Sequence, residues 1–199
     1  QTLRRHLGQK ARLEYEVLTT LEAPTNLPSQ VGPSPTILPG LRARQTFPTN
    51  LNPRYTFENF IPGACNKLAR SAGMTVAERP GQTSFNPLFI YGEVGQGKTH
   101  LAHAIGNYAR LLHPDKTILY LDADRFTQQY VDAVRSKQIS AFLSRFESLD
   151  IFIIDDIQFL IGRDSTQDIF FHVFKSLHEA GRQLVITADA APQEMRGLA

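Results

Sequence analysis

The chain has 199 residues, of which 42% are hydrophobic and 20% charged, and a formal net charge of +2. No apolar run reaches the length of a membrane span, and a lone cysteine, Cys65, excludes both a disulfide framework and a thiolate metal cluster. We therefore expect a cytoplasmic protein with one apolar core, in which any contact with nucleic acid comes from local patches rather than from net charge.

The first 50 residues divide into two segments that cannot form a core of their own. Residues 1–22 have the pattern of a helix end followed by a short strand, and they are too few to fold alone. Residues 23–50 are rich in proline, glycine, serine and threonine, which predicts an extended, disordered linker. A compact domain is predicted to begin at residue 51 and to run to residue 199.

Helical and strand patterns alternate along the predicted domain. The expected helices span residues 66–77, 99–112, 124–135, 139–146 and 164–180, and the expected strands span residues 87–91, 117–121, 151–155 and 184–188. The unbroken apolar run before Asp155 is typical of a strand that is buried on both faces. This order predicts an α/β fold, with a parallel sheet sandwiched by helices and functional groups at the carboxyl ends of the strands.

Residues 92–99, Gly-Glu-Val-Gly-Gln-Gly-Lys-Thr, form a complete G-x-x-x-x-G-K-[ST] phosphate-loop motif. The glycines allow a tight turn whose N–H groups face phosphate oxygens, and the following helix adds the partial positive charge of its N-terminus. Lys98 is expected to reach the β- and γ-phosphates, and the Thr99 hydroxyl to meet Mg²⁺. A chance match in a glycine-containing turn is the alternative, but the flanking strand and helix argue against it.

Carboxylates follow two of the predicted strands. Asp155 and Asp156 end the third strand, where Asp155 is expected to hold Mg²⁺ through its water shell and Asp156 to polarise the attacking water. Asp189 follows the fourth strand and could sense the γ-phosphate. The alternative for the pair is that the two carboxylates merely cap the end of a strand. The alternative for Asp189 is that it forms a turn. His100 and His103 are interpreted as packing or surface residues, because no cysteine or carboxylate completes a metal site with them.

Several runs of residues together resemble the DnaA family of bacterial chromosomal replication initiators, which are AAA+ ATPases of the P-loop class. The runs are residues 51–60, 85–92, 95–101, 153–159 and 187–189, and the resemblance covers residues 51–199 nearly without gaps. Residues 1–22 resemble the end of the small N-terminal interaction domain of that family, and the proline-rich stretch resembles its variable linker. Such a set of runs is far more specific than the phosphate loop alone.

The resemblance implies an ATPase that uses ATP mainly as an assembly switch. The ATP form of this family polymerises on origin DNA, helps to melt it, and recruits the replicative helicase, for which the N-terminal domain provides the contact. Slow hydrolysis of ATP resets the switch, so only weak ATPase activity is expected. Single-stranded DNA is expected to bind the AAA+ domain, and acidic phospholipids are a further partner that the resemblance suggests.

The resemblance also assigns roles to individual residues. It implies nucleotide binding by Gly92, Gly95, Gln96, Gly97, Lys98, Thr99 and His100, with Ile61 and Gly63 along the adenine; Mg²⁺ binding by Thr99 and Asp155; and catalytic roles for Asp155, Asp156 and Asp189. Val131 and Arg163 match positions implicated in gripping single-stranded DNA, and Lys137 is a basic residue that could contact phosphates. Ser165 departs from the basic residue that is usual there in some members.

The chain is also expected to be a fragment. It ends before the family's trans-acting arginine, its fifth strand, its helical lid and its DNA-reading helix-turn-helix domain. In the family's strand order, 5-1-4-3-2, the first strand would then have an unpaired edge. We expect this fragment to bind nucleotide weakly and to hydrolyse it hardly at all.

Two other classes of protein would share part of this sequence pattern with a replication initiator. A related AAA+ regulatory or helicase-loading adaptor would share the core domain, but it is expected to lack the N-terminal segment and the linker. A small-molecule kinase would share the phosphate loop, yet no acceptor-binding motif is recognisable in the sequence.

Overall fold

A computed structural model describes residues 48–195, so the predicted N-terminal segment (1–22), most of the predicted linker (23–50) and residues 196–199 lie outside the described residues. The elements are α1 (Lys67–Glu78), β1 (Leu88–Tyr91), α2 (Lys98–Leu112), β2 (Ile118–Asp122), α3 (Ala123–Arg135), α4 (Ile139–Glu147), β3 (Ile151–Asp155), η2 (Ile157–Leu160), α5 (Asp164–Glu179), β4 (Gln183–Ala188) and η3 (Pro192–Glu194). Every helix and strand predicted for this range is present, with bounds that differ by about one residue. In the described part of the chain, no helix combines the length and apolarity needed to cross a membrane.

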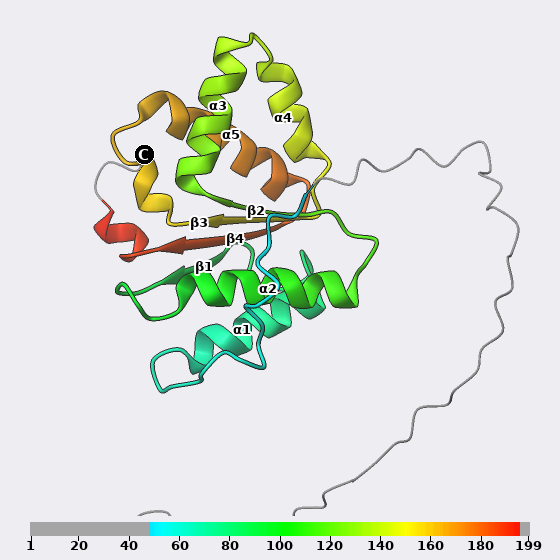
Figure 1. The fold of residues 1–199 in the computed structure, drawn as a ribbon, viewed down its shortest axis with the longest axis vertical. Coiled ribbons are helices and arrows are strands. Elements are labelled where there is room, and N and C mark those ends of the chain that lie inside the picture. Colours follow the sequence, from blue (N-terminus) through cyan, green and yellow to red (C-terminus); the bar gives the residue numbers. More distant parts are fainter. Residues whose placement is uncertain (1–47, 196–199) are drawn as a thin grey trace, which may run out of the picture. The chain divides into compact units, whose positions relative to one another are not determined.

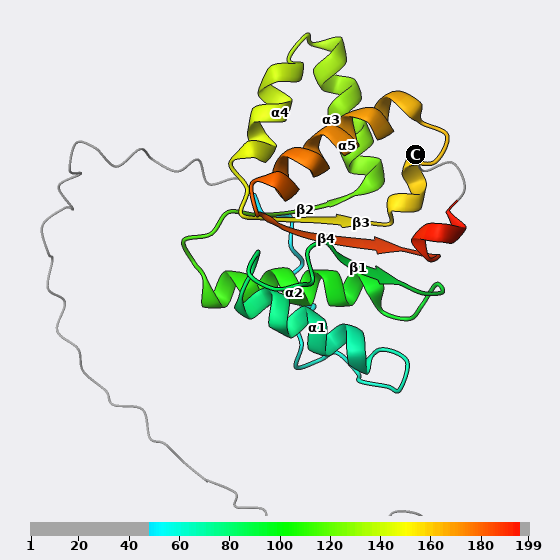
Figure 2. The same ribbon diagram turned by 180° about the vertical axis from the view of Figure 1, so that it is seen from behind.

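The strands form one parallel sheet in the order β1-β4-β3-β2. Helices α1 and α2 cover one face of the sheet, and α3, α4 and α5 cover the other (Figures 1 and 2). This arrangement confirms the predicted α/β sandwich and the order expected for these strands. Because the strands are parallel, the loops after β1, β3 and β4 all begin on the same side of the sheet, at the carboxyl ends of the strands.

The central strand β3 is buried on both faces because its residues before Asp155 are apolar throughout. In β3, Ile153 packs into the core with α1 and α2, whereas Phe152 and Ile154 pack into the core with α3, α4 and α5. This alternation follows from the two-residue period of a strand. All three side chains are at most 1% exposed, as the unbroken apolar run predicted.

Residues 48–50, which the sequence pattern assigns to the linker, already contact the domain. The backbone N–H of Tyr120 in β2 donates to the carbonyl of Thr49 at 2.9 Å, and Asn50 Nδ2 donates to the carbonyl of Tyr120 at 3.2 Å. These bonds satisfy backbone groups on the outer side of the edge strand β2. The chain therefore joins the domain at Thr49, two residues before the predicted boundary.

Candidate functional site

The loop between β1 and α2 has the backbone that a phosphate-binding loop requires. Gly95 and Gly97 have φ angles of 85° and 86°, in the left-handed region that favours glycine. Gly97 directly precedes the first turn of α2, and a Cβ built on it would lie 3.2 Å from Phe60 Cε2. The loop therefore leaves the N-terminal amides of α2 unobstructed, and the helix dipole favours an anion there.

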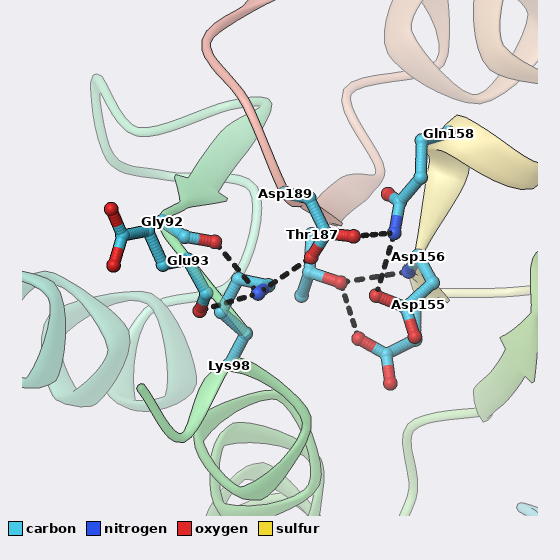
Figure 3. A network of polar contacts seen from close by, with 8 residues as sticks. All are labelled: Gly92, Glu93, Lys98, Asp155, Asp156, Gln158, Thr187 and Asp189. Atoms are coloured by element: carbon cyan, nitrogen blue, oxygen red, sulfur yellow. Dashed lines mark hydrogen bonds and ion pairs between the residues drawn. The ribbon is translucent and has the colours of Figure 1, made fainter. Parts of the chain in front are cut away.

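Lys98, in the first turn of α2, is buried and directs its ammonium group back across the loop. Its Nζ donates to the carbonyls of Gly92 at 2.7 Å and Glu93 at 3.0 Å, and it forms an ion pair with Asp189 Oδ1 at 2.8 Å (Figure 3). An ammonium has three donors and no acceptor, so these contacts satisfy it. The side chain is thus held at the loop by acceptors that phosphate oxygens can replace.

A glutamine amide connects the acidic residues that follow β3 and β4. Gln158 Nε2, in η2, donates to Asp189 Oδ2 at 2.7 Å and to Asp156 Oδ1 at 3.1 Å (Figure 3). Asp156 has a left-handed backbone with φ 56°, and its N–H donates to the Thr187 hydroxyl at 2.8 Å. The side-chain amide of Gln158 therefore connects two carboxylates that are 33 positions apart in the sequence, and keeps these like charges close to Lys98.

Asp155 is more deeply buried than its neighbour and has hydroxyl partners on both sides. Its side chain is 2% exposed. The Tyr120 hydroxyl donates to Oδ2 at 2.7 Å, and the Thr187 hydroxyl donates to Oδ1. Burial, and then the adjacent Asp155, raise the pKa of Tyr120, so its hydroxyl keeps the proton that it donates. The carboxylate is oriented from β2 and β4 at once.

The charges of this cluster are not balanced. Three carboxylates, those of Asp155, Asp156 and Asp189, face the single ammonium of Lys98 within it. Desolvation, followed by the charge of Asp155 and opposed in part by Gln158, raises the pKa of Asp156. A triphosphate would add further negative charge, so a cation bound with it would favour its binding.

The donor chemistry fits Mg²⁺ that is held by phosphates and water rather than by a protein cage. Among residues 48–195, no group of three or more histidine, cysteine or carboxylate side chains could hold a metal ion. The exposed Thr99 hydroxyl, at the end of the phosphate loop, and the buried Asp155 carboxylate, at the end of β3, are both hard oxygen ligands. Because Asp155 is already bonded through both oxygens, it would reach the ion through water, as the sequence analysis expects.

A cavity of about 420 Å³ lies where these groups meet. It is lined by residues of the phosphate loop, the two strand ends and η2: Val94, Gly95, Gly97, Lys98, Thr99, Asp156, Gln158, Phe159 and Asp189. Volumes of this size are typical of small-molecule and cofactor sites. The structure thus brings together most of the residues predicted to bind phosphate and to act on it.

The remaining residues predicted to bind nucleotide do not line this cavity. Ile61 and Gly63 belong to the loop before α1, which Asn66 holds by accepting from Gly63 N at 2.7 Å and donating to the Ile61 carbonyl at 3.2 Å. Ile61 is 86% exposed. His100 Nε2 lies 2.9 Å from the carbonyl of Thr56, with its ring against Phe60. Gln96 lines a smaller cavity of about 30 Å³ that also contacts Phe60.

The residues predicted to contact DNA are spread along α3. Arg163, at the start of α5, pairs with Asp124 in the first turn of α3 at 3.0 Å, whereas Lys137 follows the end of that helix. Val131 lies between them and is 36% exposed. A helix of this length spans about 20 Å. The three residues therefore form a strip along α3 rather than a cluster.

Sequence reasoning missed two residues that organise the site. Gln158 stands three positions after Asp155, and its proximity to the acidic pair was the available signal. Tyr120 was predicted only as part of a strand, although a tyrosine hydroxyl that becomes buried needs a hydrogen-bond partner. Tyr120 and Asp155 are 35 positions apart in the sequence, and Gln158 and Asp189 are 31 positions apart, so no local pattern identifies these two contacts.

Comparisons with known proteins give consistent results. A family model described as "Bacterial DnaA ATPAse domain" matches residues 51–199. The chromosomal replication initiator protein DnaA of Flavobacterium psychrophilum is 50% identical over 165 residues, which cover 83% of this chain and 34% of that protein. DnaA of Deinococcus deserti is 43% identical, covering 98% of this chain and 43% of that protein. The chain thus spans well under half the length of these relatives.

Solved structures agree with the sequence comparisons. Domain III of the Thermotoga maritima replication initiation protein DnaA has a TM-score of 0.73 at 43% identity, over 76% of this chain and 62% of that one. A replication initiator DnaA bound to AMPPCP and single-stranded DNA has a TM-score of 0.72 at 40% identity, over 75% and 46% of the two chains. The DnaC helicase loader, at 15% identity and a TM-score of 0.61, shares the fold alone.

Phosphate loop, acidic strand ends, sheet order and sequence identity all agree, and the chain belongs to the DnaA family of bacterial chromosomal replication initiators.

Proposed function

We propose that this chain is the nucleotide-binding part of a replication initiator whose ATP-bound form assembles on origin DNA, helps to unwind it and recruits the replicative helicase. The observation that carries the proposal is the buried ammonium of Lys98, which lies beside a cavity of about 420 Å³ and is held by acceptors that phosphate can replace. A related protein at 40% identity has been solved with AMPPCP in place, which supports ATP as the ligand.

Nucleotide binding would use the groups already assembled at the carboxyl ends of the strands. The β- and γ-phosphates lie along the amides of residues 95–99, and Lys98 exchanges the carbonyls of Gly92 and Glu93 for phosphate oxygens. Mg²⁺ bound with ATP would neutralise phosphate charge, and Thr99 and, through water, Asp155 would hold it. Ile61 and Gly63 are proposed to border the adenine.

Hydrolysis is proposed to be slow and to serve as the off switch. Asp156 would accept a proton from the water whose oxygen bonds to the γ-phosphorus, while the bond from that phosphorus to the β–γ bridging oxygen breaks and ADP leaves. Asp189 would contact the γ-phosphate from the end of β4. The raised pKa of Asp156 makes it a stronger base than an ordinary aspartate. The hydrogen bond that Asp156 accepts from Gln158 reduces its freedom to accept that proton. This is consistent with slow hydrolysis that switches the protein off, rather than with rapid catalytic turnover.

Contacts with DNA are proposed along the strip formed by Val131, Lys137 and Arg163. The related structure that contains single-stranded DNA supports this part of the proposal. Self-assembly, a helicase contact through the N-terminal segment and binding to acidic phospholipids are also proposed, on the resemblance to the family. The chromosome lies in the bacterial cytoplasm, so this function implies a cytoplasmic protein.

The initiator is favoured over a helicase-loading adaptor by the extent of the similarity. The Deinococcus deserti initiator aligns with 98% of this chain, which includes residues before the ATPase domain, at 43% identity. The helicase loader matches the fold at 15% identity. An adaptor is expected to lack the segment that precedes the domain.

Lys98→Ala tests the proposal directly. Calorimetric titration with ATP and Mg²⁺ should show an affinity at least about 100-fold lower, because at least two charge-assisted hydrogen bonds to phosphate are lost. Lys175→Ala removes an exposed lysine on α5 that forms only a long ion pair at 3.9 Å, and it should bind ATP like the unchanged chain. Equal affinities for the unchanged chain and Lys98→Ala would refute the phosphate site.

A second readout tests the switch rather than the pocket. ATP should increase retention of single-stranded DNA in a gel-shift assay with the unchanged chain, and Lys98→Ala should abolish that increase. If nucleotide binds at this loop but leaves DNA retention unchanged, nucleotide binding stands and the proposed coupling to DNA fails.

A further inference from the structure

Asp155 is oriented by two hydroxyl groups that reach it from opposite sides. Tyr120 lies on β2 and Thr187 on β4, and β3, which carries Asp155, runs between them. Each hydroxyl has one proton, and both protons go to the carboxylate. Because Thr187 also accepts the Asp156 N–H at 2.8 Å, it fixes the backbone after β3 as well. These bonds leave the carboxylate little rotational freedom.

Tyr120 is itself fixed by partners outside the sheet. Its ring stacks on His103 of α2, with ring centroids 3.9 Å apart and an interplanar angle of 29°. His103 is 6% exposed, and its Nδ1 accepts the Asn52 N–H at 3.2 Å, so Nδ1 carries no proton. The Asn52 carbonyl accepts from Asn107 Nδ2 at 2.8 Å, which ties this segment to α2.

The backbone of Tyr120 is held by the same stretch of chain. Residues 49–52 supply the carbonyl that accepts the Tyr120 N–H and the Asn50 amide that donates to the Tyr120 carbonyl. Ring, backbone and hydroxyl are therefore each constrained, and the constraint on the ring comes from the helix that begins at the phosphate loop.

We propose that the hydroxyls of Tyr120 and Thr187 are positioning groups that aim the Asp155 carboxylate at the water shell of Mg²⁺, and that the His103 ring and residues 49–52 brace Tyr120 for this purpose. The inference rests on the proposed binding of ATP with Mg²⁺. It adds that residues 49–52, at the start of the domain, contribute to the position of the Asp155 carboxylate through their contacts with His103 and Tyr120.

Tyr120→Phe removes one oxygen and retains the ring that stacks on His103. The full chain is titrated calorimetrically with a non-hydrolysable ATP analogue, once with Mg²⁺ and once in EDTA, and the ratio of the two affinities is the Mg²⁺ gain. We expect the gain to fall about tenfold, the size expected for one hydrogen bond to a charged group. Affinity in EDTA should stay within about twofold, which a general loss of structure would not allow.

Matched variants separate positioning from packing. Tyr108→Phe, in a tyrosine whose ring packs against Phe57, should keep the full Mg²⁺ gain. The double variant Tyr120→Phe/Asp155→Asn should lose no more of the gain than Asp155→Asn alone, since both changes act through one carboxylate. Additive losses would overturn the proposal.

The outcomes distinguish this inference from the function on which it rests. An unchanged chain that does not bind the analogue, or binds it equally with and without Mg²⁺, overturns both. If the unchanged chain shows the Mg²⁺ gain and Tyr120→Phe shows the same gain, only the positioning role is overturned. Should Tyr120→Phe fail to fold, as judged by circular dichroism, Thr187→Val and Thr187→Ser decide: the valine variant should lose the gain and the serine variant keep it, and equal gains would overturn the proposal.

Discussion

Alanine in place of Gly97 should destabilise the domain more than alanine in place of Gly95, although the two glycines have the same backbone conformation, with φ angles of 86° and 85°. A left-handed alanine costs about 1–2 kcal/mol at either position. The new Cβ at Gly95 meets no atom within 4 Å, whereas at Gly97 it would lie 3.2 Å from Phe60 Cε2.

Phe60 has little room to yield, because it is 5% exposed and its ring stands edge-on to His100 at 5.2 Å. Crowding of this kind adds about 1 kcal/mol, so we expect Gly97→Ala to cost about 2–3 kcal/mol in total. Urea unfolding followed by circular dichroism measures the difference, with an unchanged dependence on urea as evidence that only stability has changed.

The same pair of variants tests the phosphate loop. Gly97→Ala displaces the first amides of α2 and should weaken ATP binding more than Gly95→Ala does. If the two variants unfold at the same urea concentration and bind ATP equally, the described contact between the loop and Phe60 does not constrain the site.

Two further predictions concern charge. Asp156→Asn should raise the free energy of unfolding at pH 7, since the pKa of Asp156 is raised in the folded protein and its ionisation therefore opposes folding; the advantage should shrink as the pH falls toward the ordinary aspartate value of about 4. Asparagine tolerates the left-handed backbone and can still accept from Gln158, and urea unfolding at several pH values checks the trend, which a pH-independent difference would contradict. Arg163→Ala should weaken single-stranded DNA binding and lower the salt dependence of the affinity by about one phosphate contact, whereas Lys175→Ala should change neither; identical salt slopes for the two variants would exclude Arg163 from the DNA surface.

The fold could be predicted from sequence because its signals are local. The apolar run of β3, the helical period after Lys98 and the glycine that ends α5 each lie within one element, and alternation of helices and strands then dictates a parallel sheet. The phosphate loop and the acidic strand ends were likewise visible as short motifs. Parallel strands bring such ends together without any further information.

The connections within the site could not be predicted in the same way. Nothing near Tyr120 in the sequence indicates that its hydroxyl meets Asp155, and nothing near Gln158 indicates Asp189, because these contacts depend on strand register. His103 was expected to be a packing or surface residue, but its stacking on Tyr120 depends on how α2 crosses the sheet. Residues 48–50 were assigned to the linker because their composition continues it, although the Thr49 carbonyl and the Asn50 side chain form hydrogen bonds with β2.

A crystal structure of this chain with Mg²⁺ and a non-hydrolysable ATP analogue is the most direct test of the central claim. We predict that the triphosphate lies on the amides of residues 95–99, with Lys98 Nζ moved from the carbonyls of Gly92 and Glu93 to phosphate oxygens. Asp155 should remain bonded to Tyr120 and Thr187 and face the water shell of the ion. A triphosphate bound elsewhere, with Lys98 still on those carbonyls, would contradict the account.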